Sequence, residues 1–216
     1  MTLSSLPVGS HQCLCTRTAH ASKLVVLTGG PGGGKTAILE LARKYFCKHV
    51  ILLPEAASIV FSGGFPRLDT VSGHRAAQMA IFRVQREMER LAVADRPAMI
   101  LCDRGTIDGL AYWPFSRQAF FRSVETTMRQ ELARYSAVVH IETPPPSVYT
   151  NNTIRHESSH QADEINEKVR QAWESHSNRF LVHSSGNFLE KAEAALEVIR
   201  NQMPVCCRTH SHRLGV

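Results

Sequence analysis

The sequence predicts an α/β protein in which a parallel β-sheet is covered by helices on both faces. Short apolar runs rich in Val, Ile and Leu alternate along the chain with longer segments whose apolar residues recur at helical spacing. The runs lack the polar–apolar alternation of half-exposed strands, which is typical of parallel strands buried on both sides. No internal repeat or linker interrupts residues 23–202. We therefore expect one domain with right-handed crossovers between its strands.

Five apolar runs are predicted to form the strands, at residues 24–29, 49–55, 98–103, 137–143 and 179–184. Helical spacing covers residues 35–47, 76–92, 115–135, 162–177 and 188–202. Core packing is the favoured interpretation of His140 and Trp173, which fall inside these elements. The two flanks, residues 1–22 and 203–216, show no stable period. They are predicted to be a disordered leader and a flexible tail around the folded domain at 23–202.

Composition and cysteine usage exclude some classes of protein. No stretch approaches the ~18 consecutive apolar residues of a membrane-spanning helix. The six cysteines follow no zinc-type spacing in the sequence, and this pattern suits a reducing, cytoplasmic compartment. Two cysteine pairs lie in the flanks, Cys13 with Cys15 and Cys206 with Cys207. Metal or redox capture by those flanks is a minor alternative.

The net charge bears on which binding partners the protein can have. The chain carries +6 at pH 7, and three of these charges lie in the two flanks. The remaining excess over residues 23–202 includes no Lys/Arg cluster of the kind that binds nucleic acid. A phosphorylated ligand fits this charge at least as well as a nucleic-acid surface, so a nucleic-acid partner is not favoured.

A glycine-rich loop follows the first predicted strand and matches G-x-x-x-x-G-K-[ST] in full. It reads Gly29, Gly30, Pro31, Gly32, Gly33, Gly34, Lys35 and Thr36. Glycines let backbone N–H groups approach phosphate oxygens where a Cβ would intrude, and the following helix adds its unpaired N–H groups. We expect Lys35 to reach the β- and γ-phosphates of ATP or GTP and the Thr36 hydroxyl to bind Mg²⁺.

Charged residues end the second and third predicted strands. Ligands of open α/β sheets sit beyond the carboxyl ends of the strands, so these side chains are candidates for the site. Glu55 could accept a proton from a substrate hydroxyl, and a structural ion pair is the alternative. Asp103 occupies the Walker-B position and is expected to hold Mg²⁺, with Arg104 beside it for a substrate or phosphoryl group. Asp108 could act in the site or cap the next helix.

A polar segment at residues 149–158 precedes the helix expected at 162–177. It contains Arg155, which is a suitable electrostatic clamp for a transferring phosphoryl group. Closure of such a segment would exclude water from the reaction. We therefore predict a lid with Arg155 as its functional residue.

Four segments together resemble a known family. LTGGPGGGKT, LPEAAS, CDRGTIDGLAYW and NNTIRHESSHQADEI, followed by A-W-x-x-H, are similar to the AAA-type P-loop family. That family groups the nicotinamide-riboside kinase domain with the eukaryotic translocation-defect GTPase. The resemblance covers roughly residues 23–202. It implies a kinase-like sheet ordered 2-3-1-4-5, a nucleotide at the glycine loop and an acceptor near Glu55 and Asp103. It also implies an anchoring or base role for Glu55 and a lid role for Arg155.

Two functions from different classes follow from these residues. The favoured hypothesis is a cytoplasmic enzyme, a Mg²⁺-dependent kinase that phosphorylates a small hydroxyl-bearing, nucleoside-like acceptor. Its motivation is Glu55, an acid beyond what phosphate binding alone requires. The alternative is an ATP- or GTP-hydrolysing switch that binds a phospholipid or protein partner. No N-K-x-D or T-K-x-D motif follows the fourth predicted strand, which argues against a guanine-specific switch.

Overall fold

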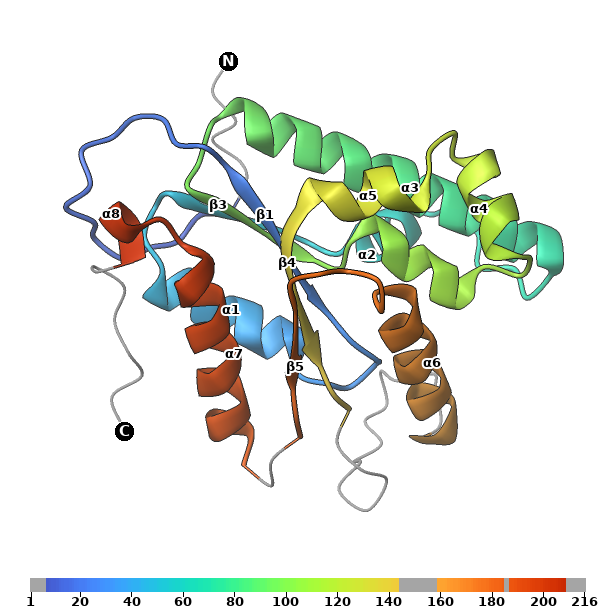
Figure 1. Cartoon of the computed structure of the whole chain (residues 1–216). Coiled ribbons are helices and arrows are strands. Elements are labelled where there is room, and N and C mark those ends of the chain that lie inside the picture. Colours follow the sequence, from blue (N-terminus) through green and yellow to red (C-terminus); the bar gives the residue numbers. More distant parts are fainter. Residues whose placement is uncertain (1–6, 144–158, 185–186, 209–216) are drawn as a thin grey trace.

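The computed structural model describes residues 7–143, 159–184 and 187–208 (Figure 1). A single sheet of five parallel strands has the order β2-β3-β1-β4-β5. This order confirms the predicted one. The strands are β1 (Lys23–Thr28), β2 (Val50–Leu53), β3 (Met99–Asp103), β4 (Tyr135–Ile141) and β5 (Arg179–Val182). Within the described residues, no helix is both long and apolar enough to cross a bilayer.

Helices connect the strands and cover the sheet. They are α1 (Lys35–Tyr45), α2 (Ala56–Ser62), α3 (Val71–Ala94), α4 (Arg117–Ser123), α5 (Met128–Arg134), α6 (Ser159–Ala172), α7 (Phe188–Gln202) and α8 (Val205–Arg208). A 3₁₀ helix, η1 (Thr106–Tyr112), follows β3. The helix expected at 188–202 has the predicted bounds.

The sheet separates two apolar cores. Figure 1 shows α1 and α7 on one face and α3, α5 and α6 on the other. Val25 and Leu27 of β1 belong to the first core, and Leu24 and Val26 belong to the second, because neighbouring strand residues point to opposite faces. Trp173 is fully buried in the second core. Its predicted packing role is therefore confirmed.

The segment expected as one helix at 115–135 is two short helices. Residues 124–127 separate α4 from α5, and Glu125 among them has a φ of +58°. The hydroxyls of Ser116 and Thr127 accept N–H groups of the first turns of α4 and α5. Each is an N-cap, which satisfies otherwise unpaired donors and starts a new helix. The residue Tyr135 belongs to β4 instead of a helix.

The flanking segments also differ from the expected disorder in their described parts. The N–H of Gly9 donates to the carbonyl of Val50 at 2.9 Å, and the N–H of Leu52 donates to the carbonyl of Pro7 at 2.9 Å. Residues 7–9 thus pair with the edge of β2, where unpaired backbone groups are available. At the other end, Cys207 on α8 is fully buried.

Candidate functional site

The loop between β1 and α1 has a backbone conformation that requires glycine. Gly29 has a φ of +131°, and Gly34, the N-cap of α1, has a φ of +89°. A Cβ on Gly29 would lie 2.1 Å from the carbonyl oxygen of Ile141 at the end of β4. The N–H of Gly30 donates to Oδ1 of Asn166 on α6 at 2.9 Å. The loop therefore fits closely between β4 and α6, and it continues directly into the first turn of α1.

Lys35 is the first residue of α1, and its ammonium group contacts the backbone of this loop. Its Nζ donates to the carbonyls of Gly29 at 3.1 Å and Gly30 at 2.7 Å. Burial lowers the pKa of Lys35 to about 7, and the positive charge of Arg104 adds to this effect. A buried ammonium that donates to two carbonyls would gain much from a phosphate.

Asp103 and Thr36 lie at the same end of the sheet. Asp103 is the last residue of β3, and Thr36 is exposed on the first turn of α1. Both line one cleft with Lys35. Burial raises the pKa of Asp103 to about 6, and the negative charge of Glu55 adds to this effect. A carboxylate and a hydroxyl so placed are suitable oxygen ligands for Mg²⁺.

Arg104 connects the ends of β2 and β3 to the glycine loop. Its Nε donates to Oε1 of Glu55 at 2.7 Å, and its Nη1 donates to the carbonyl of Gly29 at 3.2 Å. Burial by itself would raise the pKa of Glu55, but the Arg104 charge and a hydrogen bond from Ser58 shift it below its usual value. Glu55 is therefore ionised and held in place.

Asp108 organises the segment after β3. Its Oδ2 accepts the N–H of Gly105 at 2.9 Å and the indole N–H of Trp173 at 3.1 Å. Its Oδ1 accepts the Thr28 hydroxyl and, at 3.2 Å, a guanidinium N–H of Arg104. The bond from Gly105 caps η1, the bonds from Thr28 and Trp173 hold the carboxylate, and the bond from Arg104 orients the guanidinium.

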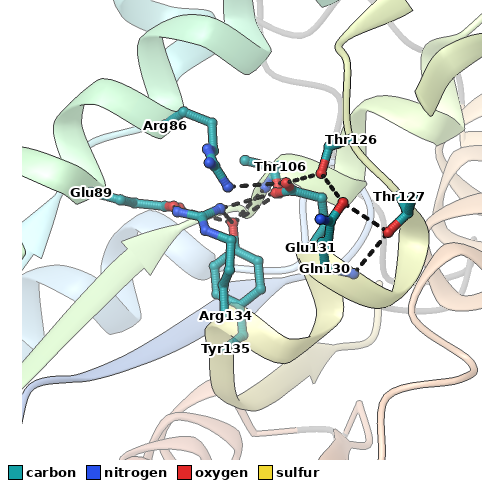
Figure 2. Close-up of polar contacts among 9 residues, drawn as sticks. All are labelled: Arg86, Glu89, Thr106, Thr126, Thr127, Gln130, Glu131, Arg134 and Tyr135. Carbon is teal, nitrogen blue, oxygen red and sulfur yellow. Dashed lines mark hydrogen bonds and ion pairs between the residues drawn. The ribbon is translucent and has the colours of Figure 1, made fainter. Parts of the chain in front are cut away.

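A buried network of hydrogen bonds and ion pairs connects η1 to α3, α5 and β4 (Figure 2). The hydroxyl of Thr106 donates to Oε2 of Glu131 at 2.8 Å, and its N–H donates to the Tyr135 hydroxyl at 2.9 Å. Glu131 and Glu89 are fully buried, and Arg134 forms ion pairs with both. The two carboxylates are therefore compensated, and η1 is held rigidly against α3 and α5.

One cleft of about 860 Å³ extends from the glycine loop to side chains of α2, α3 and the segment between them. Glu55 and Arg104 line the cleft together with Lys35 and Asp103. We call the part of this cleft that is lined by α2, α3 and the segment between them the α2–α3 chamber. Its lining includes Phe61, Leu68, His74, Gln78, Phe82 and Gln85. The guanidinium of Arg67 lies 4.0 Å from the centre of the Phe61 ring at its wall.

The structure thus brings together most of the predicted site residues. Lys35, Thr36, Glu55, Asp103 and Arg104 line one cleft, with Pro31 and Gly32 of the loop. The lid arginine predicted at 155 lies outside the described residues.

Sequence reasoning missed the α3 side of this cleft and the role of Asn166. The Oδ1 of Asn166 lies 2.9 Å from both the N–H of Gly30 and Nε2 of His140, so α6 contacts the loop directly. Gln78 and Gln85 are buried and line the cleft. They are seven residues apart on one helical face. Two amides on the inner face of an amphipathic helix were a signal for a polar cavity.

The fold and the cleft define the class of this protein. A family model described as an AAA domain matches residues 24–191, a span that contains the glycine loop and the charged strand ends. The chain belongs to this family of P-loop proteins, as the resemblance in the sequence implied.

Two solved structures show the same fold. The crystal structure of NadR protein in complex with NR has 17% identity to this chain and a TM-score of 0.65. The alignment covers 90% of this chain and 54% of that chain. NadR protein in complex with NAD and AMP-PNP has 16% identity and a TM-score of 0.62, with 90% and 52% covered. This chain therefore spans about half the length of NadR. No curated protein matches it.

Proposed function

We propose that this protein is a Mg²⁺-dependent kinase that transfers the γ-phosphoryl group of ATP, or GTP, to a small nucleoside-like acceptor. One observation carries the proposal. The cleft beside the glycine loop continues past Glu55 and Arg104 into the α2–α3 chamber. A protein that only binds and hydrolyses a nucleotide has no need of a cleft that extends this far beyond the phosphate end of its site.

The glycine loop and Lys35 are proposed to bind the triphosphate. The loop supplies backbone N–H groups and the dipole of α1. Lys35 is already held at the loop by the carbonyls of Gly29 and Gly30, so little movement is needed to reach phosphate oxygens. When phosphates arrive, their charge favours the protonated form of this lysine.

Thr36 and Asp103 are proposed to hold Mg²⁺. Their hydroxyl and carboxylate oxygens have the chemistry that the ion prefers, and they come from adjacent elements at one end of the cleft. A bound Mg²⁺ would neutralise charge on the phosphates. The raised pKa of Asp103 is consistent with an acid whose natural partner is a cation.

Glu55 is proposed to orient the acceptor hydroxyl and to receive its proton. Arg104 and Ser58 each donate to one carboxylate oxygen. Each oxygen keeps a second lone pair that can accept a hydroxyl hydrogen bond. Arg104 is proposed to contact the transferred group or the acceptor. Arg155 is proposed as the lid clamp on the phosphoryl group.

The α2–α3 chamber supports a nucleoside-like acceptor. Phe61, Leu68 and Phe82 provide apolar walls, and the amides of Gln78 and Gln85 provide hydrogen-bonding groups. Such walls suit a planar ring with a polar edge. The NadR structure in complex with NR points to the same class of acceptor. A cytoplasmic location belongs to this proposal, because all six cysteines are free thiols.

The test is a transfer assay with γ-labelled ATP, in parallel with GTP, Mg²⁺ and a panel of nucleosides that includes NR. A labelled nucleoside monophosphate that depends on both Mg²⁺ and Lys35 is the expected result. Hydrolysis without transfer to any acceptor would contradict the proposal. Turnover stimulated only by phospholipid vesicles would favour the nucleotide-dependent switch instead.

A further inference from the structure

A cluster of thiols and imidazoles lies far from the cleft. It joins three parts of the chain: the N-terminal segment with Cys13, Cys15 and His20, the connection from α1 to β2 with Cys47 and His49, and α8 with Cys206 and Cys207. The glycine loop precedes the first residue of α1, whereas Cys47 follows the last turn of this helix. The cluster therefore lies near the amino ends of the strands, and the cleft lies at their carboxyl ends. In Figure 1 these parts meet beside α8.

Within this cluster, four ligand atoms of Cys13, Cys47, His49 and Cys207 all lie within 4.8 Å of one another. The Nδ1 of His49 is 3.5 Å from Sγ of Cys207 and 3.9 Å from Sγ of Cys47. A tetrahedral zinc site with Zn–S of about 2.3 Å and Zn–N of about 2.0 Å has S···N edges of about 3.5 Å and S···S edges of about 3.8 Å. The two S···N distances of His49, 3.5 Å and 3.9 Å, are near the S···N edge, and the other ligand pairs lie within 4.8 Å.

We propose that Cys13, Cys47, His49 and Cys207 form a structural zinc site that ties the N-terminal segment and α8 to the sheet. Three thiolates and one imidazole are an established ligand set for structural Zn²⁺. On binding, each of the three thiols loses its proton to solvent, and neutral His49 donates the lone pair of Nδ1. Zinc and thiolates undergo no change of oxidation state.

The surroundings of these ligands suit a closed site. Cys47 and Cys207 are fully buried, and Cys13 and His49 are partly buried. Cys47 and His49 are two residues apart on the short connection between α1 and β2. A closed, partly buried site with four protein ligands leaves no position for substrate, as in structural zinc sites.

A second set of ligands shares two residues with the first. Cys15 and His20 lie within 4.8 Å of His49 and Cys207, with Sγ of Cys15 3.5 Å from Nε2 of His20. We assign the ion to the first set because it offers three thiolates, and thiolates are the ligands that favour zinc over harder cations. Cys15 and His20 are matched controls, because they lie in the same cluster but outside the assigned set of ligands.

The test is a titration of the full-length chain, purified under reducing conditions and stripped by a chelator, with Co²⁺ as a spectroscopic substitute for Zn²⁺. One Co²⁺ per chain with the absorption bands of tetrahedral thiolate coordination is expected, followed by displacement with Zn²⁺. Cys47→Ser, Cys207→Ser and His49→Ala should each weaken binding by more than the ~10–100-fold that loss of an outer-shell partner costs. Cys15→Ser and Cys102→Ser should bind normally.

His49→Cys keeps the proposal testable if the other variants do not fold. It converts the ligand set to four thiolates and should retain Co²⁺ binding with stronger thiolate bands. Zinc should also raise the melting temperature of the parent, because a ligand bound only by the folded state stabilises it. Absence of thiolate bands in the parent would overturn the proposal. Binding lost in Cys15→Ser but kept in Cys47→Ser would overturn the assigned ligands.

Discussion

Arg104 and Glu55 form an ion pair across the ends of β2 and β3, with Nε of Arg104 2.7 Å from Oε1 of Glu55. Arg104 has a φ of +68°, a conformation that costs a non-glycine residue about 1–3 kcal/mol. The fold compensates this cost because the guanidinium also reaches Gly29 and Asp108. The pair therefore couples the glycine loop to the entrance of the α2–α3 chamber.

Because of this ion pair, we expect Glu55→Gln to change the stability of the protein. The variant should lose about 1.5–3 kcal/mol of unfolding free energy, the range for a hydrogen bond to a charged group. Because the folded pKa of Glu55 lies below its usual value of 4.5, this contribution is present above pH 4.5. It is lost as the pH falls through the folded pKa.

The same variant should retain ATP affinity and lose acceptor phosphorylation by at least about a hundredfold, because a positioned base contributes about 10²–10⁴-fold. Calorimetry, denaturant titration and the transfer assay measure the three quantities. Ser58→Ala, which removes only the second hydrogen bond to Glu55, is the matched control. A stable, fully active Glu55→Gln would show that Glu55 is not the base.

Lys35 should take up a proton when the nucleotide binds. Its pKa in the free protein is lowered to about 7, so at about pH 8 most molecules carry it uncharged. Triphosphate binding raises this pKa, and up to one proton enters the complex. At about pH 6 the lysine is already charged, and uptake should be small. Calorimetry in buffers of different ionisation enthalpy, without Mg²⁺, measures the proton count.

Lys35→Ala should abolish the pH-dependent uptake and weaken ATP binding by roughly 10–100-fold, the equivalent of one charge-assisted hydrogen bond. The fold should be intact, because the two hydrogen bonds that the ammonium donates go to carbonyls of the glycine loop. Lys44→Ala on the same helix should behave as the parent. Unchanged ATP binding by Lys35→Ala would mean that the glycine loop is no phosphate site.

Asp103→Asn should reduce Mg²⁺-dependent turnover more than metal-free nucleotide binding. The carboxylate supplies charge that an amide lacks, and its raised pKa of about 6 means that activity should fall as the pH drops below about 6. Mg²⁺ titrations of turnover and of nucleotide affinity separate the two effects. Asp69→Asn, at another acid in the cleft, is the control. Equal losses of turnover and metal-free binding would make Asp103 a structural acid.

The network behind η1 should be essential for stability. Glu131→Gln leaves Arg134 and Arg86 with less compensating charge and should cost about 3–5 kcal/mol, as for a broken buried ion pair. Glu87→Gln breaks an exposed pair with Arg90 and should cost no more than about 1 kcal/mol. Denaturant unfolding measures both values. Equal stability of the two variants would contradict the structural role of the network.

Several features were predictable from the sequence because their causes are local. Apolar runs of strand length and helical periodicity depend on near neighbours, so the five strands and α7 were found close to their final bounds. The glycine loop requires positive φ angles, which glycine adopts without strain. The motif can therefore be recognised from the sequence alone. The break between α4 and α5 was also local, but it depended on two N-caps, Ser116 and Thr127.

Contacts between distant residues were not predictable in this way. The flank at 7–22 looked disordered because it lacks a period of its own. Its backbone contacts are made with the end of α1, with β2 and with the segment before β3, all of which come later in the chain. Likewise, no zinc-type spacing joins Cys13 to Cys207, because the fold brings them together across almost the whole sequence.

By itself, the sequence determined the fold class, the phosphate-binding loop and the candidates Glu55, Asp103 and Arg104, because each depends on a short stretch of chain and on the shared carboxyl edge of parallel strands. Only the tertiary structure decided that Arg104 pairs with Glu55, that α3 closes a chamber beside them and that the two flanks meet. These features depend on which crossover packs against which face of the sheet. That packing minimises exposed apolar surface over the whole molecule, and no local pattern records it.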